Sequence, residues 1–197
     1  GNSSGGIIEG NVISGNGNEA EWQTDRITGG IFLHASSPTI TNNIIQNNKL
    51  HGITEMNGSR PILNYRERAL NQINNNGDPY DPAVFDAEIR WFDQSIPHLD
   101  YGHNDIMDED GGYLIYGNYS PFNPVVRVRH NYWAEFEPTL ENRFYPIEGY
   151  LFRPYDTEPN GTPPNGFFAD APALFDQGLQ CAEDEDWDRS EERRVGK

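Results

Sequence analysis

A short phrase recurs along the first part of the chain, and it constrains the fold more than any other feature. Gly-Ile pairs occur at 6–7, 30–31 and 52–53, each in an apolar run beside Asn- and Gly-rich segments. Successive copies are 24 and then 22 residues apart. Self-similarity at a period of roughly 20 to 50 residues is typical of solenoids, in which each repeat packs only on its neighbours. The sequence therefore predicts stacked, repeated strands.

A second phrase, a Pro followed by an alternating apolar run, repeats in parallel with the first. Its copies begin at Pro38, Pro61, Pro97 and Pro124. The last two copies are each followed, at the same offset, by a His-Asn pair, at 103–104 and 130–131. Pro at the first position of a strand removes no hydrogen bond from the sheet. We therefore expect a strand after each Pro, with His103 and His130 stacked at equivalent corners.

Asn is abundant, with 21 residues in the chain of 197. Asn tolerates the left-handed backbone conformation of tight corners, and stacked Asn amides hydrogen bond to one another as a ladder. Both properties suit a parallel β-helix, in which short strands stack about 4.8 Å apart. The alternative is a β-sandwich with hairpin turns at Asn57-Gly58 and Asn76-Gly77, although both turns lie inside the longer period.

The alternation of each strand predicts which side chains face the core. The predicted inward residues are Ile7, Ile31, Ile40, Ile44, Ile53 and Val126. The predicted outward residues are Thr39, Thr41, Arg127 and Arg129.

These phrases resemble those of the right-handed parallel β-helix family of exported bacterial proteins, the pectate-lyase-like superfamily with NosD-type (PbH1) repeats. The resemblance covers residues 1–155. It includes Asn131-Tyr132-Trp133, which is similar to the Asn-Tyr-Trp-Gly ending of such helices, with Ala134 in place of Gly. It implies an all-β, right-handed, single-stranded parallel β-helix and a secreted or cell-surface location. Trp133 is expected to cover the end of the core, as terminal repeats must.

Three further segments follow the predicted β-helix. Residues 156–172 are rich in Pro, Gly and Asn and predict a linker. Residues 173–188 read as helical and resemble the start of a tetratricopeptide repeat or a sorting region. Residues 189–197 resemble the translation of a common sequencing-adapter sequence, so we interpret them as an artefact.

Composition excludes some classes of function. The net charge of −17 opposes nucleic-acid binding, and no apolar stretch approaches the roughly 20 residues of a membrane span. A single Cys cannot form an intrachain disulfide. The chain opens within a repeat, without Met or a signal peptide, so we expect a fragment whose targeting signal lies upstream.

Residues 64–93 fit the repeat least well and predict an insertion at one corner, and a similar excursion is expected over 16–28. Aromatic side chains in these insertions would stack on sugar rings. The predicted carbohydrate-binding residues are Trp22, Tyr80, Trp91 and Phe92.

The acidic run before Gly111-Gly112 is the candidate metal site, with Asp105, Asp108 and Asp110 as oxygen ligands for Ca²⁺. It lacks the twelve-residue loop of a full Ca²⁺ motif, and a solvated acidic corner is the alternative. Copper handling of the NosD kind would require Met, Cys or grouped His, which this chain of two Met and one Cys does not offer.

No lyase or hydrolase motif is recognisable in the chain. A lyase on this fold needs a cation and a Lys or Arg base, and a hydrolase needs two placed carboxylates. We therefore interpret the chain as a non-catalytic β-helix scaffold that binds carbohydrate, such as a polysaccharide or a cell-surface glycan, or another surface partner. The alternative is a polysaccharide lyase or glycoside hydrolase whose site is completed by upstream repeats.

Overall fold

The computed structural model describes residues 5–17, 29–64, 69–77, 86–117, 125–134 and 139–160. They belong to the first of two compact units, residues 1–162; the second unit, 163–197, lies outside the described residues. The predicted helical segment 173–188, the tail 189–197 and most of the predicted linker therefore lie outside them too. No helix in the described part of the chain has the length and apolar character needed to cross a bilayer.

The described residues form an all-β structure in which every pairing between strands is parallel. The largest sheet has the order β12-β10-β8-β6-β3 and contains β3 (Gly29–His34), β6 (His51–Met56), β8 (Ala87–Trp91), β10 (Tyr113–Gly117) and β12 (Phe144–Tyr145). A second sheet contains β2 (Val12–Ser14), β5 (Ile44–Gln46), β7 (Gln72–Asn74) and β9 (Asp105–Met107). Two pairs complete the set: β1 (Ile7–Glu9) with β4 (Thr39–Thr41), and β11 (Val126–Arg127) with β13 (Tyr150–Leu151). The short 3-10 helices η3 (Thr139–Arg143) and η4 (Ile147–Gly149) flank β12.

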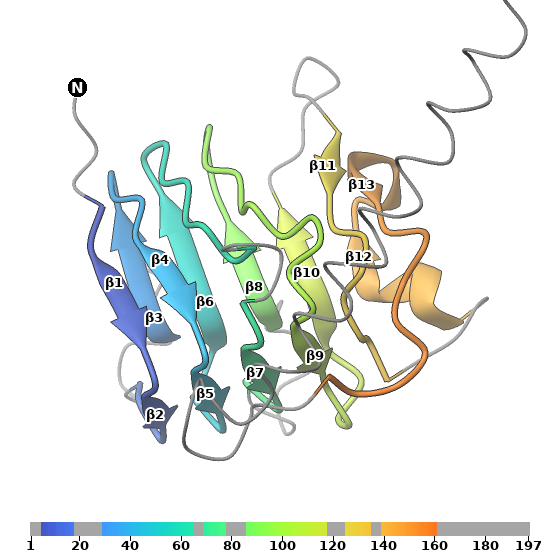
Figure 1. The fold of residues 1–197 in the computed structure, drawn as a ribbon, viewed down its shortest axis with the longest axis horizontal. Helices are drawn as coiled ribbons and strands as arrows, with labels where there is room; N and C mark the ends of the chain where they lie inside the picture. Colours follow the sequence, from blue (N-terminus) through green and yellow to red (C-terminus); the bar gives the residue numbers. More distant parts are fainter. Residues whose placement is uncertain are drawn as a thin grey trace, which may run out of the picture. The chain divides into compact units, whose positions relative to one another are not determined.

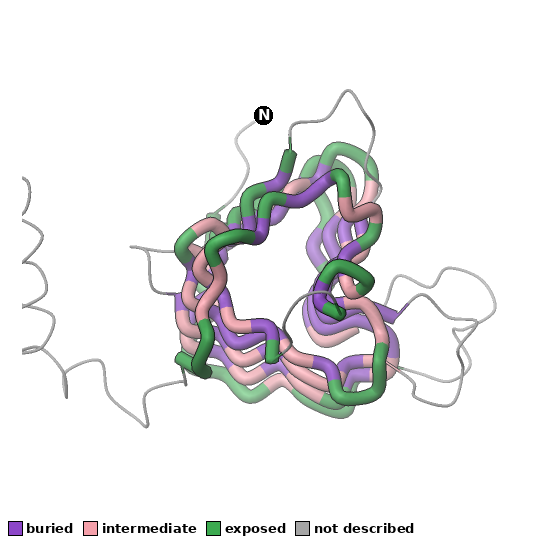
Figure 2. Tube along the Cα trace, turned by 90° about the vertical axis from the view of Figure 1, so that its right-hand side faces the viewer, coloured by how far each residue is buried: buried purple, intermediate pink, exposed green. Residues whose placement is uncertain are grey.

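Strands that are neighbours in a sheet come from successive passes of the chain (Figure 1). After β3 the chain runs through β4 and β5 and returns to the first sheet as β6, and later passes repeat this order. In the end-on view the passes superimpose, and buried and exposed residues recur at corresponding places of successive passes (Figure 2). We call each pass a level.

The predicted repeat phrases are confirmed in part. Ile31 lies directly against Ile53 in the largest sheet, and both are buried. The Pro phrases also stack, because Thr39 bridges to Ile62 and Ile62 bridges to His98. The prediction that the first Gly-Ile pair is a copy of the same repeat phrase is wrong. Ile7 pairs with Thr39 and therefore aligns with the Pro phrase.

The predicted pattern of burial is right for Ile31, Ile40, Ile53 and Val126 and wrong for Ile7 and Ile44. Ile7 is 70 % exposed, and Ile44 is only half-buried. Each is followed by a second Ile, and in both pairs it is the second, Ile8 or Ile45, that faces the core. Alternation forces one of two adjacent Ile residues outward, and composition alone does not indicate which.

The predicted outward set is also only partly right. Arg127 is exposed, while Thr39 and Arg129 are half-buried, Arg129 in a two-bond pair with Asp100. Thr41 is buried, because its hydroxyl donates a hydrogen bond to the carbonyl of Ala69 on the next level.

Two ladders of side-chain amides run across the levels at two corners. The first Asn ladder consists of Asn11, Asn43, Asn71, Asn104 and Asn131. The second Asn ladder consists of Asn16, Asn48 and Asn76 and ends at Glu88. In both, each Asn oxygen after the first Asn accepts bonds from the backbone N–H and the side-chain amide of the preceding Asn. The predicted role of Asn is therefore confirmed.

The predicted corner histidines lie one above the other. His103 and His130 both have left-handed backbone, with φ of 48° and 54°, and their ring centroids are 5.9 Å apart. His103 Nδ1 lies 2.8 Å from a carboxylate oxygen of Asp156. This corner therefore ties residues near the end of the described chain to the preceding levels.

Aromatic side chains fill the core where the described levels end. Trp133 is 1 % exposed and meets Phe144 edge-on, and Phe144 in turn stacks on Phe152. The predicted burial of Trp133 at the end of the core is confirmed. Ala134, which follows it, has φ of 57°, in the left-handed region that favours Gly.

Candidate functional site

The outer face of the largest sheet carries one side chain per level in a continuous row. Because Ile31, Ile53, Ile89, Ile115 and Phe144 face the core, the next position along each strand faces outward. The register aligns these outward positions across all five strands. This outer row consists of Phe32, Thr54, Arg90, Tyr116 and Tyr145, of which Thr54 is completely buried.

The last three members of the outer row stack on one another. The rings of Tyr116 and Tyr145 lie 4.6 Å apart and nearly parallel. The Arg90 guanidinium carbon lies 4.5 Å from the centre of the Tyr116 ring and 4.6 Å from that of Phe92. Cation–π contacts of this kind hold a guanidinium in place at the surface, so the Arg90 side chain is well positioned.

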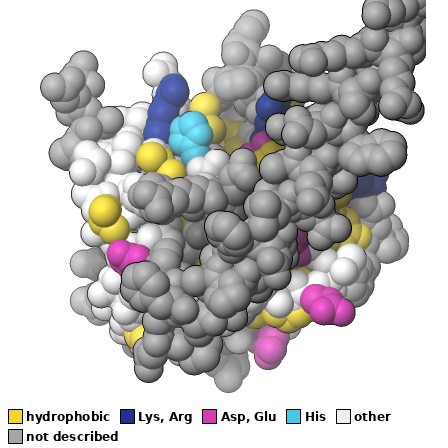
Figure 3. Space-filling view, viewed as in Figure 1, with side chains coloured by type: hydrophobic (Ala, Val, Ile, Leu, Met, Phe, Trp, Pro, Cys, Tyr) yellow, Lys and Arg dark blue, Asp and Glu magenta, His cyan; other side chains and the backbone are white. Residues whose placement is uncertain are grey.

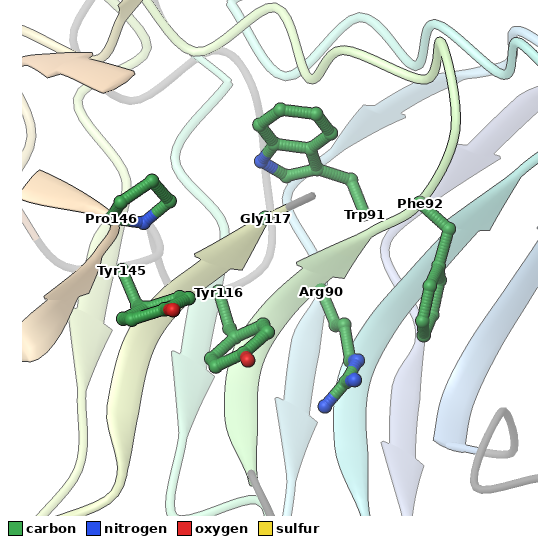
Figure 4. Close-up of a pocket in the computed structure, with 7 residues that line it drawn as sticks. All are labelled: Arg90, Trp91, Phe92, Tyr116, Gly117, Tyr145 and Pro146. Atoms are coloured by element: carbon green, nitrogen blue, oxygen red, sulfur yellow. The ribbon is translucent and has the colours of Figure 1, made fainter. Parts of the chain in front are cut away.

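A pocket of about 370 Å³ opens over these side chains. Figure 4 shows Arg90, Tyr116 and Tyr145 along one side of the sheet, with Phe92 beside them and Trp91 pointing to the opposite side of β8 from Arg90. The remaining lining comes from Gly117 and Pro146. Tyr145 is 46 % exposed and is the most accessible ring of the pocket. The pocket therefore combines aromatic surface, phenol hydroxyls and one guanidinium.

Partial burial raises the pKa of the Tyr116 phenol, and the positive charge of Arg90 opposes this rise. The phenol is therefore neutral at physiological pH. A neutral phenol both donates and accepts a hydrogen bond, which matches the hydroxyl groups of a sugar.

The structure corrects the predicted carbohydrate-binding residues. Phe92 lines the pocket and stays a predicted carbohydrate-binding residue, but Trp91 is buried in the core and presents no ring face to a ligand. Trp22 and Tyr80 lie outside the described residues. The prediction that 64–93 is an insertion is wrong for its described ends, because β7 and β8 are regular members of two sheets.

Sequence reasoning missed Arg90, Tyr116 and Tyr145. The alternation of Ala87, Ile89 and Trp91 was a usable signal for β8, because it has the period of a strand with one buried face. It would have placed Arg90 outward and Trp91 inward.

The acidic corner is held together by contacts within the protein. Asp108 pairs with Arg143 at 3.0 Å, and both side chains are almost fully buried. Asp105 accepts hydrogen bonds from the backbone and side chain of Asn160, while Asp110 is exposed. Among the described residues, no group of three or more His, Cys, Asp or Glu side chains is placed to hold a metal ion. The structure therefore does not bring the three predicted Ca²⁺ ligands together.

Where described side chains are visible in Figure 3, Lys and Arg lie in the upper half of the view and the most prominent Asp and Glu mainly below them, with hydrophobic side chains between.

No protein-family model, curated protein or solved structure matches this chain. We therefore infer function from the geometry and chemistry of the pocket.

Proposed function

We propose that the described levels are turns of a right-handed parallel β-helix and that the pocket on its outer face binds a glycan. Consistently parallel pairing between successive passes supports the β-helix. Crossovers between parallel strands of one sheet are right-handed in about 98 % of cases, which supports the handedness. In this proposal the chain is a non-catalytic scaffold of a secreted or cell-surface protein.

The observation that carries the proposal is the line of Arg90, Tyr116 and Tyr145 along one wall of the pocket. The faces of Tyr116 are occupied by Arg90 and Tyr145, so it meets a ligand with its edge and hydroxyl. Tyr145 has one face against Tyr116, and we assign its other face to a sugar ring. Phenol hydroxyls and the in-plane N–H groups of a guanidinium suit the hydroxyl and ring oxygens of carbohydrate.

Catalysis by a lyase or a hydrolase is the second candidate, favoured by the cation that Arg90 places in the pocket. A glycoside hydrolase needs two carboxylates flanking the scissile bond. Among the described residues that line the pocket there is neither Asp nor Glu. Binding without turnover is therefore the function that this lining supports best.

The test is a binding screen against immobilised neutral and uronic-acid polysaccharides, with product release measured on the same panel. We expect at least one polysaccharide to be retained without cleavage and Tyr145→Ala to weaken its binding roughly tenfold, a loss of about 1.4 kcal/mol. Phe32→Ala is the matched control, because Phe32 is equally exposed and lies in the same outer row but outside the pocket. Equal loss in both variants, or retention of no polysaccharide, would refute the proposal, and turnover would favour the enzyme.

A further inference from the structure

The side chain of Glu55 lies on the core-facing side of the sheet that carries the pocket. Register places Glu55 between Leu33 on β3 and Trp91 on β8, with Gly117 of β10 beyond Trp91. Leu33 and Trp91 belong to the apolar core, and Glu55 is completely buried with them. A carboxyl group occupies a position that the neighbouring levels fill with apolar side chains.

Neither carboxyl oxygen of Glu55 has a hydrogen-bond partner among the described residues. The contrast is with Glu88, which is equally buried but accepts hydrogen bonds from the backbone and side chain of Asn76. Leaving a buried polar group without a partner is unfavourable, and leaving it charged is far more so. A residue that only filled space would not carry this penalty, which suggests a role for the carboxyl group.

Hydrogen bonds connect the neighbourhood of Glu55 to the pocket. Trp91 Nε1–H donates to the hydroxyl of Tyr150 at 2.9 Å, and that hydroxyl donates to the carbonyl of Tyr145 at 3.3 Å. Trp91 and Tyr145 both line the pocket. The charge of Glu55 contributes to the raised pKa of Tyr150, which is due mainly to burial, so the carboxyl group lies within electrostatic reach of this chain of bonds.

Gly117 holds the Trp91 indole in this arrangement. A Cβ at position 117 would overlap three atoms of the indole, so the ring occupies the space of the missing side chain. The indole thus packs against the Gly117 backbone on the core side of the sheet, so a shift of the ring would reach the pocket through the backbone of Trp91 and Gly117, which line it.

We propose that Glu55 is an internal proton switch that sets the geometry of the pocket. The proposal that this pocket binds glycans underlies the switch's role in binding, but the structural change itself does not depend on it. With its proton in place, Glu55 leaves the hydrogen bonds from Trp91 to Tyr150 and from Tyr150 to Tyr145 intact. When the proton leaves to solvent, the carboxylate becomes a strong acceptor and competes for the Trp91 N–H and the Tyr150 hydroxyl, because charge-assisted hydrogen bonds are roughly twice as strong as neutral ones.

Burial raises the pKa of Glu55 well above its ordinary value of 4.5, which moves the transition to higher pH. Among the described residues, other titratable groups on the strands of this sheet include His34, Tyr113 and Tyr145. Tyr150 faces Glu55, His51 and Glu88 are buried at the starts of β6 and β8, and Arg90 and Tyr116 lie on the outer side. Glu88 is the second buried carboxyl of this set, so it is the natural control.

The test follows the indole N–H resonance of Trp91, assigned with Trp91→Phe, from about pH 5 to pH 10, a range above the ordinary pKa of Glu. We expect this resonance to titrate in the wild type and to be constant in Glu55→Gln, which cannot ionise. Glu88→Gln should keep the titration. Glu55→Leu, an apolar second variant, should also remove it and remains informative if Glu55→Gln does not fold.

The switch is overturned if the resonance titrates equally in the Glu55 variants, if it does not titrate in the folded wild type, or if circular dichroism shows that the change is global unfolding. Binding of a retained polysaccharide should follow the same midpoint in the wild type and lose its pH dependence in Glu55→Gln. An indole titration without any polysaccharide binding would confirm the switch and refute the proposed glycan function.

Discussion

The two Asn ladders begin in the same way and end differently. In the first ladder, Asn131 still donates its amide to backbone carbonyls at the last level. In the second, Asn76 gives its backbone N–H and its amide to the carboxylate of Glu88. An amide both donates and accepts, so it propagates a ladder, whereas both carboxyl oxygens of Glu88 accept from Asn76 and therefore end the ladder. Glu88 thus places a titratable group at the end of the second ladder, where the first ladder has a neutral amide.

Further charged groups act on the pKa of Glu88, the residue that ends the second ladder. Burial raises the pKa of Glu88, the hydrogen bonds from Asn76 lower it, Asp108 raises it and Arg143 lowers it. Arg143 also donates to the backbone carbonyls of Gly112 and Asp108. The end of the second ladder therefore depends on the charged groups around Glu88, whereas the first ladder consists of amides throughout.

The largest expected effect tests this dependence on charge. Arg143→Met leaves the buried Asp108 without its ion-pair partner, which should lower the free energy of unfolding by about 3 to 5 kcal/mol. Chemical denaturation measures the loss. The matched control is Arg153→Met, whose partner Glu141 is half-exposed, and its change should stay within about 0.5 kcal/mol. Equal effects in the two variants would mean that the network contributes nothing beyond a surface pair.

The next effect tests the amide ladder. Asn71→Ala removes the acceptor for both Asn43 donors and the donor to the Ile40 carbonyl, all buried or nearly so. We expect a loss of about 3 kcal/mol in the free energy of unfolding, since each unsatisfied buried group costs roughly 1 to 3 kcal/mol. Asn11→Ala, at the exposed end of the same ladder, should cost less than about 1 kcal/mol. A larger loss for Asn11→Ala would contradict the ladder as a cooperative unit.

A third, smaller effect distinguishes the ladders by pH. Because the pKa of Glu88 is raised in the folded state, its contribution to stability is fully present below its ordinary pKa of 4.5 and is lost as pH rises through the folded value. Glu88→Gln should therefore reduce the fall in stability with rising pH, as measured by denaturation at a series of pH values. Glu55 has a raised pKa of the same sign, so the double variant with Glu55→Gln should flatten the profile further. An unchanged slope in Glu88→Gln would show that the second ladder does not titrate.

The smallest effect concerns the end of the first ladder. Ala134→Gly should raise the free energy of unfolding by up to about 1 kcal/mol, because a left-handed backbone costs an L residue roughly 1 to 2 kcal/mol, part of which the flexibility of Gly offsets in the unfolded chain. Ala87→Gly, in the buried strand β8, should instead destabilise. Thermal melts of both variants would measure the difference in sign.

The site was harder to predict than the fold, and Trp91 and Tyr145 show why. Trp91 reads as a surface aromatic when 64–93 is taken for an insertion, but the register with Glu55 places it in the core. Tyr145 became part of the site only through its pairing with Tyr116, 29 residues earlier in the chain. The aromatic residues could be recognised in the sequence, but the side of the sheet to which each side chain points could not.

The sequence by itself determined the features that depend on local chemistry. Asn at corners, Pro before strands and the alternation around Ile31 and Ile53 follow from the backbone preferences and polarity of single residues, which act within a few positions. Only the tertiary structure decided which strands became neighbours, because residues paired between levels are separated by 22 positions for Ile31 and Ile53 but by 36 for His51 and Ala87. A row such as Arg90, Tyr116 and Tyr145 exists only after those unequal lengths of chain have been folded into register, since stacking acts through space and leaves no fixed spacing in the sequence.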